Sequence, residues 1–224
     1  LKKGAPMFRL LQGDVGSGKT IVSILVSAIA IANGVQVAIM APTEILATQH
    51  FHSFKQQLDK SKIPCAQLLG KMNKKIRASI LEGIKSGDIP IIIGTHALIQ
   101  KDVEFKNLGL VIVDEQHRFG VDQRAKLIEK GFSPHFLAMT ATPIPRTLSI
   151  TYHGDMDLSI IDEKPADRIP IKTKVIEPPR LEKVYDFIRK EVNSGHQCMV
   201  IYPLVEESEK SDLAAAKQAY HNLD

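Results

Sequence analysis

A glycine-rich segment between an apolar run and a long helical pattern limits what the start of this chain can fold into. Residues 13–20 read GDVGSGKT and match the pattern G-x-x-x-x-G-K-[ST]. Residues 7–12 are mostly apolar and indicate a strand. Residues 20–32 are almost entirely Ile, Val, Leu, Ala and Ser and predict a buried helix, which Asn33 and Gly34 end. The order strand, glycine-rich turn, helix is typical of the beginning of an α/β unit.

The residue types in this segment point to phosphate binding. Glycines let the backbone curl so that successive N–H groups face an anion, and the following helix adds its partial positive charge. We expect Lys19 to reach the β- and γ-phosphates of ATP and the Thr20 hydroxyl to bind Mg²⁺. The alternative is a glycine-rich turn that binds nothing. The residues expected to bind the nucleotide are Gly13, Asp14, Val15, Gly16, Ser17, Gly18, Lys19 and Thr20.

Further apolar runs alternate with helical patterns along the first part of the chain. The runs cover residues 35–40, 91–93, 110–113 and 136–139, and the helices cover residues 44–58 and 74–85. Short runs that are apolar on both faces predict an α/β fold with a mostly parallel sheet flanked by helices. Polar residues follow these strands, and the carboxyl ends of parallel strands are where such sheets bind ligands.

An acidic segment follows the run 110–113. Asp114 at the tip of this strand is expected to hold Mg²⁺ opposite Thr20, and Glu115 to orient and deprotonate the attacking water. Gln116 and His117 lie one step further on and are expected to sense the γ-phosphate. The alternative for Asp114 and Glu115 is a pair of charges at a helix N-terminus.

Small hydroxyl residues follow the last strand of this set. Thr140, Ala141 and Thr142 are expected to hydrogen-bond the acidic segment and to transmit its state to the rest of the molecule. The alternative is a turn that Pro143 terminates. His50 and His52 fall within the helical pattern 44–58 and are interpreted as ordinary helix surface.

The character of the chain changes past Asp155. Residues 162–170 are charged and contain two prolines, as a linker does. A strand at 171–176, a helix at 180–193, a strand at 197–205 and a helix at 211–223 follow, and they predict the start of a second α/β unit. The predicted organisation is a first domain at 1–158, a linker at 159–170 and a truncated second domain at 171–224.

Composition excludes several classes of protein. Among the 224 residues, 44% are hydrophobic and 24% are charged, which excludes wholesale disorder. The two cysteines argue against a disulfide scaffold and fit a reducing compartment, so we expect a cytoplasmic protein. No apolar run approaches the roughly 18 residues of a membrane span. Residues 1–158 hold 19 basic against 13 acidic residues, a net charge of +6, which is compatible with a polyanionic partner.

Several longer strings make a specific family resemblance. They are APTEILATQH (41–50), GTHALIQ (94–100), DEQHRFGVDQR (114–124), MTATPIPRTL (139–148) and PLVEES (203–208). With the glycine-rich segment, they resemble superfamily 2 helicases, in particular the bacterial branch-migration helicases. The resemblance covers nearly the whole chain. It implies a RecA-like P-loop NTPase domain followed by the start of a second one.

The same resemblance implies a function and further site residues. It implies an ATP-dependent DNA helicase or translocase on branched or forked DNA, active in fork reversal, Holliday junction migration and repair, with ATP and Mg²⁺ as cofactors. By this resemblance, Lys19 and residues 114–117 are expected to be catalytic. Residues 140–142 are expected to couple the state of the acidic segment to the rest of the molecule. We expect a monomer that binds DNA independently of its sequence, through the backbone-contacting residues Pro42, Thr43, Glu44, Gly94, Thr95 and His96.

Departures from the family pattern leave alternatives open. Nothing in the chain corresponds to the N-terminal wedge domain, to the adenine-contacting segment or to the arginine finger of the second motor domain, so we expect a motor fragment. A translocase like the transcription-repair coupling factor is the near alternative. A small-molecule P-loop kinase and a fragment that binds nucleotide or DNA without turnover are the others.

Overall fold

The computed structural model describes residues 5–115, 118–142, 156–163 and 171–201. The chain divides into two compact units, Leu1–Arg168 and Ile169–Asp224, and each is described by itself. The first unit contains the candidate site.

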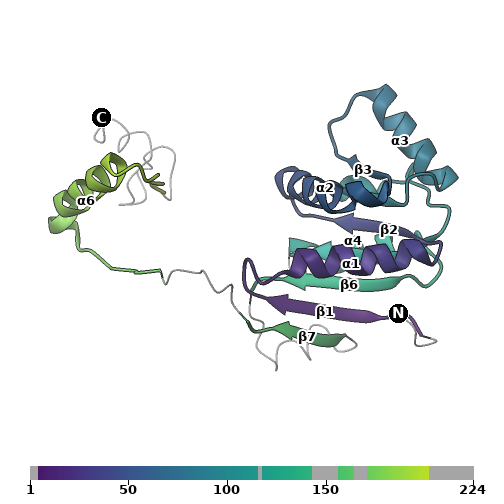
Figure 1. The fold of residues 1–224 in the computed structure, drawn as a ribbon, viewed down its shortest axis with the longest axis horizontal. Helices are drawn as coiled ribbons and strands as arrows, with labels where there is room; N and C mark the ends of the chain where they lie inside the picture. Colours follow the sequence, from purple (N-terminus) through teal and green to yellow (C-terminus); the bar gives the residue numbers. More distant parts are fainter. Residues whose placement is uncertain (1–4, 116–117, 143–155, 164–170, 202–224) are drawn as a thin grey trace. The chain divides into compact units, whose positions relative to one another are not determined.

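A seven-stranded sheet forms the centre of the first unit, in the order β3-β4-β2-β5-β6-β1-β7. Every pair of neighbouring strands is parallel, and the arrows of β1, β2 and β6 in Figure 1 point the same way. The fold class predicted from the sequence is therefore confirmed. The strands are β1 (Phe8–Gly13), β2 (Gln36–Met40), β3 (Cys65–Leu68), β4 (Ile91–Gly94), β5 (Leu108–Asp114), β6 (His135–Thr140) and β7 (Asp157–Ile161).

Helices connect these strands, and their ends have recognisable local causes. The Thr43 side chain accepts a hydrogen bond from the Leu46 N–H at the start of α2, and Gly87 ends α3 with a φ of 87°. In the described part of the first unit, the helices are α1 (Lys19–Ala32), α2 (Glu44–Leu58), α3 (Lys74–Ser86) and α4 (Val121–Ile128), with short 3₁₀ turns η1 (Asp59–Ser61) and η2 (His96–Ile99).

The sheet separates two hydrophobic cores, because successive strand residues face opposite sides. In β2, Val37 and Ile39 pack into one core, and Ala38 and Met40 pack into the other. The first core also takes buried residues of α1 and α2, and the second takes residues of α3, η2 and α4. With helices on both faces, ligands can reach the sheet only at its edges, and the loops after β1, β2, β4, β5 and β6 all leave its carboxyl edge.

Among the residues described in the first unit, two strands and one α-helix were not predicted from the sequence: β3, β7 and α4. β7 pairs with β1 from Arg9↔Asp157 to Gly13↔Ile161. The first unit therefore continues past residue 158, where the sequence predicted its end. The prediction that the first helix is buried is also wrong for one stripe, since Ile21, Leu25 and Ile29 of α1 are each about half exposed.

The second unit contains the turn η4 (Pro178–Arg180) and the helix α6 (Leu181–Asn193), which confirms the helix predicted there. Residues 171–177 and 197–201 are not in strands, so the strand predicted at 171–176 is wrong. A strand needs a neighbour for its backbone hydrogen bonds, and in the described part of this unit no strand is present to pair with. The predicted helix at 211–223 lies outside the described residues.

Candidate nucleotide-binding site

The glycine-rich segment forms the loop between β1 and α1. Gly16 and Gly18 have φ values of 82° and 96°, a left-handed conformation that glycine adopts without a steric penalty. Gly18 immediately precedes the first residue of α1, and the Ser17 N–H donates to the Asp14 carbonyl. The loop is thus a tight turn against a helix N-terminus, which is the arrangement that suits an anion.

Lys19 points back along this loop. Its Nζ atom donates to the Gly13 carbonyl at 2.7 Å and to the Asp14 carbonyl at 2.9 Å. The side chain is only partly exposed, so its charge is held over the loop and does not extend into solvent. A cation fixed there is suited to phosphate oxygens that enter the same turn.

Ser17 gives a second sign that the loop suits a polar ligand. Its Oγ atom is buried and, among the described residues, has no hydrogen-bond partner. Leaving such a hydroxyl unsatisfied costs about 1–3 kcal/mol, and an added Cβ at Gly13 would lie only 2.5 Å from this oxygen. The absence of a side chain at position 13 therefore leaves the space that the Ser17 hydroxyl occupies.

Asp114 and Glu115 lie at the end of β5. The Asp114 side chain is 13% exposed, and its Oδ1 atom accepts a hydrogen bond from the Glu115 N–H at 3.0 Å. Glu115 has a φ of 46°, which is uncommon and costly for a residue with a side chain. The backbone therefore turns sharply at the strand tip. Gln116 and His117 lie outside the described residues.

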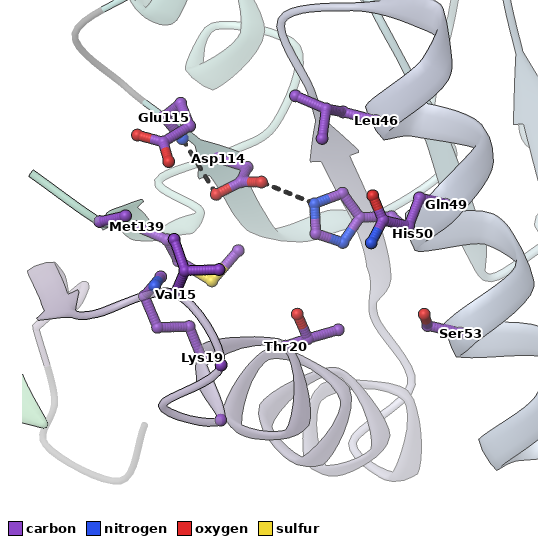
Figure 2. Close-up of a pocket in the computed structure, with 13 residues that line it drawn as sticks. Val15, Lys19, Thr20, Leu46, Gln49, His50, Ser53, Asp114, Glu115 and Met139 are labelled. Atoms are coloured by element: carbon purple, nitrogen blue, oxygen red, sulfur yellow. Dashed lines mark hydrogen bonds and ion pairs between the residues drawn. The ribbon is translucent and has the colours of Figure 1, made fainter. Parts of the chain in front are cut away.

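A cavity of about 560 Å³ brings the loop and the acidic pair together. Figure 2 shows Lys19 and Thr20 on one side of it, and Asp114 and Glu115 on another. The volume is in the range of small-ligand pockets. The residues that line it are Val15, Gly16, Gly18, Lys19, Thr20, Leu46, Gln49, His50, Ser53, Asp114, Glu115, Met139 and Ala141.

The donors around this cavity fit Mg²⁺. The ion prefers oxygen ligands, and proteins usually hold it through one or two carboxylates together with substrate phosphates and waters. The Thr20 hydroxyl and the Asp114 carboxylate are oxygen donors on the same cavity, and Asp114 is positioned by hydrogen bonds. These two residues are the ones that would hold the ion.

Helix α2 contributes a wall of the cavity that sequence reasoning missed. His50 is only 7% exposed, and its Nε2 atom lies 2.7 Å from Oδ2 of Asp114 (Figure 2). The interpretation of His50 as ordinary helix surface is therefore wrong, whereas His52 is exposed as expected. A signal was available, because His50 shares a helix face with Ala47 and Phe54, which are both buried.

The hydroxyls at the end of β6 and just after it bond to each other. Thr140 is fully buried, and its Oγ1 atom lies 2.9 Å from Oγ1 of Thr142 and accepts from the Thr142 N–H. Ala141 lines the cavity. The segment therefore reaches the nucleotide site, and the coupling role of Thr140, Ala141 and Thr142 stays a prediction.

The residues expected to contact DNA form a second cluster at the carboxyl edge. A Cβ added to Gly70 would lie 3.5 Å from Oε1 of Glu44 and 3.8 Å from Nε2 of His96, so three loops meet there. Thr43, Glu44 and His96 are exposed and Pro42 is partly exposed, whereas Gly94 and Thr95 are buried. Of the two predicted segments, 42–44 thus offers exposed side chains at two positions and 94–96 only at His96.

Comparison with known proteins agrees with this geometry. The family model described as "DEAD/DEAH box helicase" matches residues 3–150. The chain is 52% identical over 222 residues to the ATP-dependent DNA helicase RecG of Aquifex aeolicus, covering 98% of this chain and 28% of that protein. For the RecG of Bacillus subtilis the identity is 51%, with coverages of 97% and 32%. The chain thus spans about a third or less of these relatives.

Solved structures give the same result for the fold. A structure of RecG bound to a three-way DNA junction matches with a TM-score of 0.76 and 45% identity over 89% of this chain and 27% of that one. The Hef helicase domain of Pyrococcus furiosus matches with a TM-score of 0.56 at 20% identity, covering 84% of this chain and 43% of that one, and shows the fold alone. Among the residues that the structure describes, no helix is both long and apolar enough to span a membrane.

The matched family model covers most of the chain, including its phosphate loop. The chain therefore belongs to the DEAD/DEAH box helicase family.

Proposed function

We propose that this chain is the nucleotide-hydrolysing part of an ATP-dependent DNA helicase that moves along branched DNA. One observation carries the proposal: the phosphate loop and the Asp114–Glu115 pair, which are far apart in the sequence, line the same cavity. The relatives at about 50% identity bear the name of such a helicase. A P-loop kinase has no comparable support.

The residues of this cavity divide the work of ATP hydrolysis between them. The loop N–H groups and Lys19 bind the phosphates, and Thr20 and Asp114 provide oxygen ligands for Mg²⁺. When bound between these residues, Mg²⁺ would supply positive charge that offsets the negative charge of the phosphates. Glu115, on the wall of the same cavity, would accept a proton from the attacking water.

DNA binding is proposed for the second cluster at the same edge of the sheet. Thr43 and Glu44 are exposed beside Gly70 and His96, and the exposed Lys71 follows Gly70 directly. Side-chain hydroxyls and lysines hold phosphates without reading bases, so the contact should be independent of sequence and weaken with salt. The similar RecG structure is bound to a three-way DNA junction. We propose the same class of partner here, bound by a monomer.

The ATPase rate of the full-length protein tests this function. The rate should be low without DNA, rise with linear duplex and rise most with forked DNA, and the forked DNA should be unwound. A rate that does not respond to any DNA would contradict the proposal. Activity only with duplex, without unwinding of the fork, would favour a plain duplex translocase.

A further inference from the structure

The helix α2 places a histidine against the acidic pair, although it belongs neither to the phosphate loop nor to the acidic segment. His50 lies within α2, and Ala47, Phe54 and Leu58 of the same helix are buried in the core. Because these neighbours fix the helix on the sheet, the imidazole has little freedom to move. Its position relative to β5 is therefore a property of the fold.

The contact that this histidine makes is specific. The His50 Nε2–H donates to Oδ2 of Asp114 at 2.7 Å, and the Glu115 N–H donates to Oδ1 at 3.0 Å (Figure 2). Both oxygens of one carboxylate are thus held by donors from two different elements. An Asp side chain otherwise rotates broadly about its last torsion, so the two hydrogen bonds select one orientation.

A carboxylate held in this way can bind a metal with less reorganisation. Each oxygen has more than one acceptor direction, so Asp114 retains capacity for Mg²⁺ or for a water on it. Partners that orient metal ligands typically contribute about 10–100-fold to metal affinity. Packing alone would not require a polar group at position 50, because Ala47 and Phe54 on either side are apolar.

From this geometry we infer that His50 is a positioning residue, which fixes the Asp114 carboxylate in the orientation that binds Mg²⁺. The inference rests on the proposed function, because it assigns Asp114 to the metal. It also gives α2 a role in the site: the helix that begins at the predicted DNA-contacting residues carries the donor that holds the metal ligand.

Binding of Mg²⁺ to the full-length protein tests the inference without turnover. A fluorescent, non-hydrolysable ATP analogue is bound first without Mg²⁺, and Mg²⁺ is then titrated. His50→Ala should raise the Mg²⁺ concentration at half-saturation by about tenfold or more, measured for each variant at an analogue concentration that saturates it without Mg²⁺. His52→Ala is the matched control, because His52 lies on the same helix and is exposed; it should behave like the parent protein.

Two amide variants separate positioning from packing. The side-chain nitrogen of Gln lies near the place of Nε2, and that of Asn lies near the place of Nδ1. His50→Gln should therefore restore Mg²⁺ binding, and His50→Asn should not. This pair answers the question even if His50→Ala fails to fold, and thermal melting shows whether the two variants are equally stable.

The outcomes distinguish the inference from the proposed function. One outcome is that Asp114→Asn weakens Mg²⁺ binding while the Ala, Gln and Asn variants of His50 all bind Mg²⁺ as the parent does. In that case the positioning role of His50 is wrong, and the proposed metal site at Asp114 is still supported. Equal Mg²⁺ binding by His50→Gln and His50→Asn also overturns the positioning role. If Asp114→Asn itself leaves Mg²⁺ binding unchanged, the proposed metal site is wrong.

Discussion

The imidazole of His50 and the carboxylate of Asp114 form a 2.7 Å hydrogen bond between residues 64 positions apart. The pair joins α2 to the tip of β5, on the wall of the cavity that also contains Lys19 and Thr20. The phosphate loop, the expected metal ligand and α2 therefore line one cavity.

Lys19→Ala should weaken ATP binding by about 10–100-fold, because hydrogen bonds to charged groups contribute about 1.5–3 kcal/mol. The ammonium group already sits over the loop carbonyls of Gly13 and Asp14, so its loss removes a preorganised cation. Calorimetric titration of the full-length protein with ATP measures the change. Lys60→Ala, at an exposed lysine of η1, is the control and should bind as the parent does. Unchanged affinity of Lys19→Ala would refute the assignment of the loop.

Glu115→Gln should leave ATP bound but slow its hydrolysis by about 10²–10⁴-fold, the usual contribution of a general base. The amide has the same shape but does not accept the proton of water. Single-turnover hydrolysis in the full-length protein separates this step from product release. Turnover at the parental rate would show that another group activates the water.

Glu115→Gly should be more stable than Glu115→Ala by about 1 kcal/mol, although both lack the carboxylate. The reason is the φ of 46° at this position, which costs a residue with a Cβ about 1–3 kcal/mol and glycine little. Denaturant unfolding of the two variants without nucleotide gives the difference. Equal stability of the two would mean that the backbone at the strand tip is not strained.

Cys65 should react very slowly with iodoacetamide at neutral pH. Burial disfavours the charged thiolate and raises the pKa of Cys65 to about 12, and the thiolate is the reactive form. The rate should therefore rise about tenfold for each pH unit and continue to rise above pH 9. The Cys198→Ser variant isolates this thiol, because Cys198 is exposed. A reaction rate that levels off near pH 9 would contradict the raised pKa of Cys65.

The sequence was sufficient to predict the elements whose residues carry their own signal. α2 spans Glu44–Leu58 as predicted, because Thr43 caps its start and apolar residues repeat on one face. Central strands such as β4 were equally clear, because Ile91, Ile92 and Ile93 are all fully buried. The phosphate loop was found for the same reason, since its glycines and Lys19 act locally.

Elements that depend on distant partners were missed. β3 is an edge strand of mixed composition whose only described strand neighbour is β4, and three of its four residues are partly exposed. β7 becomes a strand through pairing with β1, nearly the whole first unit away in the sequence. The role of His50 depends on the same kind of distant contact, since the burial of its helix face was visible in the sequence but Asp114 as its partner was not.

The central claim is that one ATP and one Mg²⁺ occupy the cavity between the phosphate loop and the acidic pair. A crystal structure of the protein with Mg²⁺ and a non-hydrolysable ATP analogue tests it most directly. The account predicts the triphosphate against Lys19, with the ion between Thr20 and the Asp114 carboxylate that His50 holds. A triphosphate bound elsewhere, or an ion without contact to Asp114 directly or through a water, would contradict it.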